Sequence, residues 1–298
     1  MRVLSWQEAE FRKRTLTALL LAPLAVAAAY FLPFWPFLWL WTAIVAVAGW
    51  EWSRLIGLER RAQRLLFIAL LGLLIALALL WPDLVEWFYL TFGWSFLTGA
   101  IAWLDHFVWP VALFWIAFAL ALRRDPAKLR QREPGRGGKI LLALFVLLSG
   151  WLFVARLRAN FGELALLYLL GLVWTADTAA YLGGRRWGET RLAPEISPKK
   201  TVEGVWGAVL GAALYTLICG LGYGIGGLFL LDFLLLAVVA VLISVSGDLL
   251  VSLYKRWAGV KESGSLIPGH GGLLDRLDSL LAAAPILYAG FFLRILLW

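Results

Sequence analysis

Charged and glycine residues are concentrated near the end of an otherwise apolar chain, between Ser244 and Asp278. The groups there that can act chemically are Asp248, Ser252, Lys255, Arg256, Lys261, His270, Gly271, Gly272, Asp275, Arg276 and Asp278. Such groups are costly at the edge of a membrane unless they bind something charged. A phosphate group with a divalent metal ion is the simplest ligand that offers both signs of charge. The segment therefore predicts a phosphate-binding site.

A polar stripe begins this region. Ser244, Asp248, Ser252 and Lys255 recur every three or four residues, so they share one face if the stretch is helical. A polar stripe at the end of an apolar span needs a partner inside the helix bundle. The stripe predicts either part of a ligand site or a structural ladder of hydrogen bonds.

The glycine-rich run 268–272 allows positive φ and a close approach of the backbone, and its free N–H groups can hold an anion. For His270, a hydrogen bond that fixes the loop competes with a ligand or catalytic role. Asp275 and Asp278 share a face if helical. Asp278 can instead cap or anchor the last helix.

Two further groups lie earlier in the chain. Lys199 and Lys200 can neutralise phosphate oxygens, and Ser197 and Thr201 can donate hydrogen bonds to them. The alternative is a basic pair that sets topology, followed by a helix cap. Asp177 lies within a predicted span, where an acidic residue indicates function unless it pairs with a neighbouring Lys or Arg.

These residue types permit a narrow chemistry. Mg²⁺ prefers one or two carboxylates together with substrate phosphates and water. Asp248 and Asp275 lie on different elements and can converge on one such ion. Phosphoryl or nucleotidyl transfer needs positioning, a metal and positive charge, without a covalent nucleophile. The chain has no Walker A pattern, so a soluble nucleotide-binding fold is not expected.

The elements that must position these residues are membrane helices. The 298 residues are 62% hydrophobic and 15% charged, against about 45–50% and about 25% in average soluble domains. The fold class expected is all-α, a polytopic integral membrane protein with about nine transmembrane helices, because a span needs roughly 17–25 apolar residues. These are residues 16–32, 36–50, 65–81, 107–122, 139–155, 164–183, 204–222, 228–250 and 279–297. Residues 82–106 are expected to be interfacial or re-entrant, with a tenth span as the alternative. We expect no β-strand.

The basic residues indicate the topology. Of the 27 lysines and arginines, 24 fall in five segments that nine spans place on one side, namely residues 1–14, 51–64, 123–139, 184–203 and 251–278. The positive-inside rule makes that side cytoplasmic. The net charge of +8 is therefore attributed to topology, and no nucleic acid is expected as a partner.

The loop 123–139, with its prolines and glycines, is typical of a flexible linker. It divides the chain into N-terminal membrane helices (1–138), without a polar motif, and a C-terminal catalytic membrane domain (139–298). Small residues at 207, 211, 220 and 224 can pack helices closely, either in a homodimer or within one chain.

At the polar residues the chain resembles the phosphatidate cytidylyltransferases, also called CDP-diacylglycerol synthases, over roughly residues 140–298. The signature of that family reads here Ser252, Lys255-Arg256, Lys261-Glu262, Pro268-Gly269-His270-Gly271-Gly272, Asp275-Arg276 and Asp278. The elements around Ser197–Thr201, Asp177 with Tyr181, and the Ser-Gly-Asp248 step are also similar. Glu262 stands where the family usually has Asp, which puts a direct metal role for this position in doubt.

The resemblance implies transfer of CMP from CTP to phosphatidate, with release of pyrophosphate and dependence on Mg²⁺. It implies Asp248 and Asp275 as metal ligands, with room for a second cation such as K⁺. Lys199, Lys200, Lys255, Arg256 and Arg276 would hold phosphates. The expected location is the bacterial cytoplasmic (inner) membrane, with the site facing the cytoplasm.

Four alternatives stay open at this point. Two of them are enzymes. One transfers CMP from CTP to another lipid phosphate or to a prenyl phosphate, and the other is a CTP-dependent lipid kinase. The third is an ion or lipid transporter in which Asp177, Asp248 and Asp275 line a pathway. Transporters usually place ion sites near the membrane midplane, whereas these charges gather at one face. The fourth is a non-catalytic scaffold, which would give no reason for the charged residues to lie together at one face.

Overall fold

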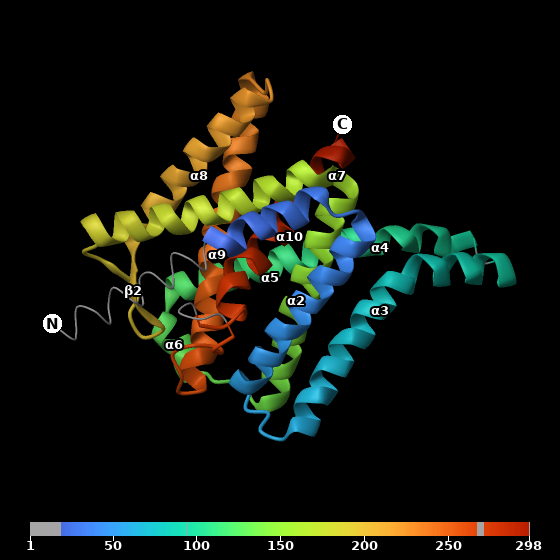
Figure 1. Cartoon of the computed structure of the whole chain (residues 1–298), viewed down its shortest axis with the longest axis horizontal. Helices are drawn as coiled ribbons and strands as arrows, with labels where there is room; N and C mark the ends of the chain where they lie inside the picture. Colours follow the sequence, from blue (N-terminus) through green and yellow to red (C-terminus); the bar gives the residue numbers. More distant parts are fainter. Residues whose placement is uncertain (1–18, 94, 267–270, 298) are drawn as a thin grey trace.

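The computed structural model describes residues 19–93, 95–266 and 271–297, and Figure 1 shows how its helices are arranged. An apolar helical segment, Leu19–Phe31, comes first. The remaining elements are α2 (Phe34–Leu55), α3 (Arg61–Phe92), the 3₁₀ helix η1 (Ser95–Ala102), α4 (Trp103–His106), α5 (Val108–Arg124), α6 (Pro126–Gln131), α7 (Arg136–Trp187), β1 (Arg191–Ala193), β2 (Ser197–Thr201), α8 (Val202–Gly222), α9 (Gly227–Trp257) and α10 (Leu274–Leu297).

The expectation of an all-α polytopic membrane protein is confirmed. Within the described residues, seven helical segments are long and apolar enough to cross a membrane. The count of nine is not confirmed. One reason is that the expected spans 139–155 and 164–183 belong to the single long helix α7. Another is that the described part of the expected span 16–32 forms only the short helix Leu19–Phe31.

Helix α7 bends sharply inside its 52 residues. The bend is at Gly162, whose φ of 81° and ψ of −174° are not helical. This left-handed region is open to glycine and strained for residues with a Cβ atom. The two expected spans are therefore two helical stretches joined without a loop.

The described part of the segment 82–106 is mostly helical, and its interfacial or re-entrant placement stays a prediction. Helix α3 continues through Pro82 and ends at Phe92. Gly93 terminates it with a positive φ of 68°, as C-terminal glycines commonly do. The 3₁₀ helix η1 and the short α4 then lead into α5, and α4 is labelled to the right of α2 in Figure 1.

The expectation of no β-strand is wrong, because β1 and β2 form an antiparallel hairpin between α7 and α8. The apolar residues Ala193 and Ile196 are almost fully buried. They pack in a small cluster with Leu122 of α5 and with Leu249 and Leu253 of α9. Burying these side chains fixes the hairpin against α9, so the residues on β2 are held close to that helix.

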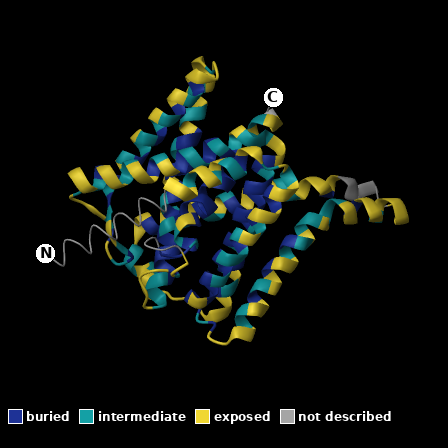
Figure 2. Ribbon diagram, in the orientation of Figure 1, coloured by how far each residue is buried: buried dark blue, intermediate teal, exposed yellow. Residues whose placement is uncertain are grey.

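Burial is greatest where α7, α9 and α10 meet, and Figure 2 shows exposed residues along α3 and α8 instead. In the most apolar stretch of α7, 67% of the residues are buried, and in that of α10, 61%, against 17% in α3. An apolar helix that is exposed on most of its surface is suited to contact with lipid. The buried helices α7 and α10, together with the part of α9 between Leu236 and Tyr254 that holds its buried residues, form the frame that carries the polar residues.

Glycines set the distance between α7 and α8. A Cβ atom at Gly207 would overlap the backbone of Ala179, and one at Gly211 would overlap the Ala179 side chain. Gly220 similarly accommodates Leu230 of α9. Small residues can pack helices within one chain or between two chains. The structure shows close packing within one chain for Gly207, Gly211 and Gly220.

Candidate active site

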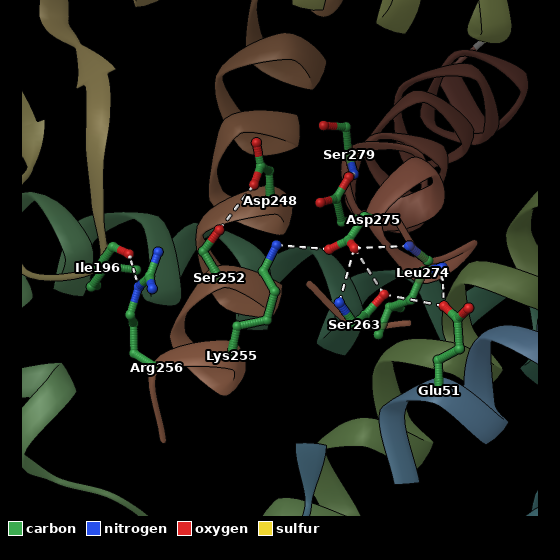
Figure 3. Close-up of polar contacts among 12 residues, drawn as sticks. Glu51, Ile196, Asp248, Ser252, Lys255, Arg256, Ser263, Leu274, Asp275 and Ser279 are labelled. Atoms are coloured by element: carbon green, nitrogen blue, oxygen red, sulfur yellow. Dashed lines mark hydrogen bonds and ion pairs between the residues drawn. The ribbon is translucent and has the colours of Figure 1, made fainter. Parts of the chain in front are cut away.

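One face of α9 carries the polar stripe. The Ser252 hydroxyl donates to Asp248 Oδ1 over 3.2 Å, and Lys255 lies one turn further on. Ser244 is buried and donates to the backbone oxygen of Val241, as serines inside helices often do. The stripe is thus confirmed for Asp248, Ser252 and Lys255, whereas Ser244 makes only a local bond. Figure 3 shows these three residues along one side of the helix.

Asp248 is paired with a lysine from the hairpin. The Nζ atom of Lys200, on β2, lies 2.6 Å from Asp248 Oδ2. The side chains stay partly accessible, 24% for Lys200 and 31% for Asp248. Lys199 precedes Lys200 on the strand, so its side chain leaves the opposite face, and it is exposed.

The turn of the hairpin is fixed by hydrogen bonds from the neighbouring helices α6 and α9. Arg256 Nε donates to the backbone oxygen of Ile196 over 2.9 Å, and Arg130 donates to that of Glu195 over 2.7 Å. Thr201 caps α8 by accepting from the N–H of Gly204. Ser197 is half-buried at the start of β2. Part of the Arg256 guanidinium therefore holds the strand that carries Lys200.

A second ion pair joins α9 to α10. Lys255 Nζ lies 2.7 Å from Asp275 Oδ1, and the two side chains are only 11% and 10% exposed. Asp275 Oδ2 accepts from the backbone N–H and the hydroxyl of Ser263, each over 3.0 Å, and from the N–H of Gly272 over 3.2 Å. Gly271 supplies the loop with a positive φ of 80°. Every oxygen of this carboxylate has a partner (Figure 3).

Three carboxylates lie close enough to interact electrostatically, namely those of Asp177, Asp248 and Asp278. Lys200 interacts with all three, and Arg276 with Asp177. Ser279 is a further polar neighbour of Asp177. The backbone at Gly247 makes this approach possible, because a Cβ atom there would overlap the carbonyl of Asp278.

One carboxylate was missed by the sequence analysis. Glu51, near the end of α2, is 6% exposed. Its Oε2 accepts from the N–H of Leu274 over 2.9 Å and lies 3.1 Å from the Ser263 hydroxyl, whose single O–H is shared between Glu51 and Asp275. The part of the chain expected to lack polar motifs therefore reaches the loop before α10. A single acidic residue within the apolar run Trp50-Glu51-Trp52 was the available signal.

The remaining predicted residues are less closely involved. Lys261 is exposed at the start of the loop. His270 lies outside the described residues.

Two cavities, of about 340 and 550 Å³, are lined by other parts of the chain. The first lies beside the α2–α3 connection and the second beside the bend in α7.

The donor chemistry suits a hard cation. Within the described ranges, no three His, Cys, Asp or Glu side chains are grouped as ligands of one metal ion. Mg²⁺ needs only one or two carboxylates when phosphates and water complete its shell. Asp248 and Asp275 supply carboxylate oxygens, the hard donors that Mg²⁺ prefers, and in binding them the ion would take the place of the lysine ammonium groups that now neutralise them. The residues present therefore fit such an ion.

The fold and the site define a class of protein, a multi-pass membrane protein with paired carboxylates and lysines where α9, α10 and the hairpin meet. Comparison with known proteins refines this. Residues 12–294 match the Cytidylyltransferase family. The chain belongs to this family.

Curated relatives agree along nearly their whole length. A phosphatidate cytidylyltransferase of Pseudomonas aeruginosa is 34% identical over 93% of this chain and 96% of its own. One from Haemophilus influenzae is 36% identical over 92% and 96%. One from Thermotoga maritima is 30% identical over 95% and 96%.

Proposed function

We propose that this protein is a phosphatidate cytidylyltransferase, an enzyme that transfers CMP from CTP to phosphatidate and releases pyrophosphate. Membership of the cytidylyltransferase family and the names of the full-length relatives support this assignment. The observation that carries it is the meeting of two ion pairs, Lys200–Asp248 and Lys255–Asp275, from three different elements.

The reaction needs little beyond charge and alignment. A phosphate oxygen of phosphatidate attacks the α-phosphorus of CTP, and the bond from that phosphorus to the bridging oxygen of the β-phosphate breaks. A lipid phosphate monoester is already largely ionised near neutral pH, so no strong general base is required. Lys200 is the more accessible lysine and can exchange Asp248 for a substrate phosphate. Lys199 and Arg276 extend the positive charge around it.

Mg²⁺ is the cofactor proposed, with Asp248 and Asp275 as the carboxylates that would hold it and with room for K⁺ as a second cation. Such an ion neutralises phosphate charge and polarises the attacked phosphorus. The residues of the chain supply the orientation. Ser252 fixes Asp248, while Ser263 and Gly272 fix Asp275.

The proposed location is the bacterial cytoplasmic (inner) membrane, with the site facing the cytoplasm, where CTP is available. Hydrogen bonds join four of the basic segments, residues 51–64, 123–139, 184–203 and 251–278. These contacts support their placement on one side of the membrane. Arg130 bonds to Glu195, Trp257 to Arg130, and Ser263 to Glu51. A homodimer remains a proposal.

The test uses purified protein in liposomes that contain phosphatidate, with labelled CTP and Mg²⁺. We expect CDP-diacylglycerol and pyrophosphate in equal amounts, and loss of both in Asp248→Asn. The matched control is Asp232→Asn, the same change in α9 about 24 Å away. Asp232 makes a partly exposed ion pair with Arg294, which contributes little to stability.

Two results would contradict the proposal. One is the absence of CDP-lipid from the wild-type protein with phosphatidate, under conditions in which another lipid or prenyl phosphate reacts. The other is full activity in Asp248→Asn.

A further inference from the structure

Glu51 is a buried carboxylate that the proposed reaction does not use. Its side chain enters the site from α2, an element 212 residues before Ser263 in the chain. A carboxylate in an apolar helix is costly and is retained where it has a specific partner. Its hydrogen-bond partners are the Ser263 hydroxyl and the Leu274 N–H.

Both partners adjoin Asp275. Leu274 is the first residue of α10 and directly precedes Asp275, so its N–H is one of those that a helix start leaves without an intrahelical partner. The Ser263 hydroxyl lies 3.1 Å from Glu51 Oε2 and 3.0 Å from Asp275 Oδ2. Glu51 therefore touches two groups beside Asp275, namely the Ser263 hydroxyl, which also contacts the Asp275 carboxylate, and the N–H at the start of α10 (Figure 3).

Two glycines make room for this carboxylate. A Cβ atom at Gly264 would overlap Glu51 Oε1, and one at Gly272 would overlap Glu51 Oε2 and the Ser263 hydroxyl. Thus glycine, the smallest residue, occupies the two loop positions, Gly264 and Gly272, at which a Cβ atom would meet Glu51. The loop is shaped around the Glu51 side chain.

We propose that Glu51 is a positioning residue, which fixes Ser263 and the start of α10 and thereby orients Asp275 toward Lys255 and the substrates. This inference rests on the proposed function. It joins the N-terminal helices to the reaction through one side chain. Residues that orient a metal-binding carboxylate typically change activity about 10–100-fold when they are replaced.

The test compares Glu51→Gln with Glu51→Met. Both fill the volume of glutamate, but glutamine keeps an acceptor oxygen for Ser263 and Leu274, whereas methionine has none of comparable strength. We expect kcat to fall about 10–100-fold in Glu51→Met, with smaller changes in KM, and less in Glu51→Gln. Glu59→Gln, a change at an exposed residue just after α2, is the control and should retain wild-type kcat.

A second readout does not depend on activity. Amide hydrogen exchange of the substrate-free protein in detergent should be faster at Ser263, Gly272 and Leu274 in Glu51→Met, and unchanged at the α7–α8 crossing. It would still report on Glu51 if the wild-type protein made no CDP-lipid, so the two proposals can fail separately.

A double-mutant cycle completes the test. If Glu51 acts through Ser263, then adding Ser263→Ala to Glu51→Met should lower kcat by less than the product of the two single effects. Wild-type kcat in both Glu51→Met and Glu51→Gln would indicate that Glu51 only fills space and would overturn the proposal. An equal loss of kcat in both variants would overturn the role given to its acceptor oxygen. Unchanged exchange at the three amides in Glu51→Met would also overturn the proposal.

Discussion

At the scale of residues, the two ion pairs of the site differ in burial. Lys255 and Asp275 are 11% and 10% exposed, whereas Lys200 and Asp248 are 24% and 31% exposed. Removing one partner of a buried pair leaves an uncompensated charge and costs about 3–5 kcal/mol. We therefore predict that Asp275→Asn lowers both stability and activity, while Asp248→Asn lowers mainly activity.

Thermal unfolding of both variants in the same detergent measures this difference, with Asp232→Asn as the reference for an exposed aspartate. A melting temperature of Asp275→Asn as high as that of Asp248→Asn would show that the Lys255 charge is relieved by water or by another group. Because Asp248→Asn is expected to stay folded, it is the better variant for testing the reaction.

The same residues show how far sequence reasoning reaches. Helical spacing alone predicts that Asp248, Ser252 and Lys255 share a face, since the period of a helix is fixed. Spacing cannot reveal that Lys200 meets Asp248, because that contact depends on how the hairpin packs. It also cannot reveal Glu51, whose partner lies 212 residues away. Contacts within an element were predictable, and contacts between elements required the fold.

At the scale of elements, Gly247 controls how closely α9 approaches α10. A Cβ atom there would overlap the backbone carbonyl of Asp278, and backbone cannot move aside as a flexible side chain can. We predict that Gly247→Ala lowers stability by about 1–3 kcal/mol, as overpacking typically does, and separates Asp248 from Asp278. Gly72→Ala is the control, because a Cβ atom at Gly72 of α3 meets nothing within 4 Å.

Unfolding of both glycine variants, followed by the CDP-lipid assay, gives the measurement. We expect Gly72→Ala to be as stable as the wild type or more so, since alanine favours a helix over glycine by about 0.8–1.0 kcal/mol. Wild-type stability and activity in Gly247→Ala would mean that the helices can separate without disturbing the site.

The elements that sequence reasoning misjudged are those whose local signal was weak. Strands β1 and β2 have three and five residues, too few for an alternating pattern to stand out. Their stability comes from Ile196 and Ala193 packing on α9, a contact that no local pattern shows. The bend at Gly162 likewise depends on one glycine, which is common in membrane helices. Long apolar helices, by contrast, were predictable from length and composition.

At the scale of the whole molecule, charge and fold agree. The segments around residues 51–64, 123–139, 184–203 and 251–278 hold most of the basic residues, and hydrogen bonds connect them. The turn between α8 and α9 lies at the opposite end of the molecule from the α2–α3 connection in Figure 1. Helix α8 has 21 residues and spans about 31 Å, the thickness of a bilayer core.

This arrangement predicts which residues face which side of the membrane. Cys219 is the sole cysteine of the chain, so a Cys219→Ala background permits single-cysteine variants. In right-side-out vesicles, a thiol reagent that cannot cross the membrane should label Tyr223→Cys, in the α8–α9 turn, and spare Glu59→Cys, beside the α2–α3 connection. Inverted vesicles should show the reverse, and the Cys219→Ala parent should stay unlabelled in both. Labelling of both cysteines from one side would contradict a bilayer that separates the two loops. Labelling of Glu59→Cys from outside, with Tyr223→Cys spared, would place the site away from cytoplasmic CTP and thus contradict the proposed orientation.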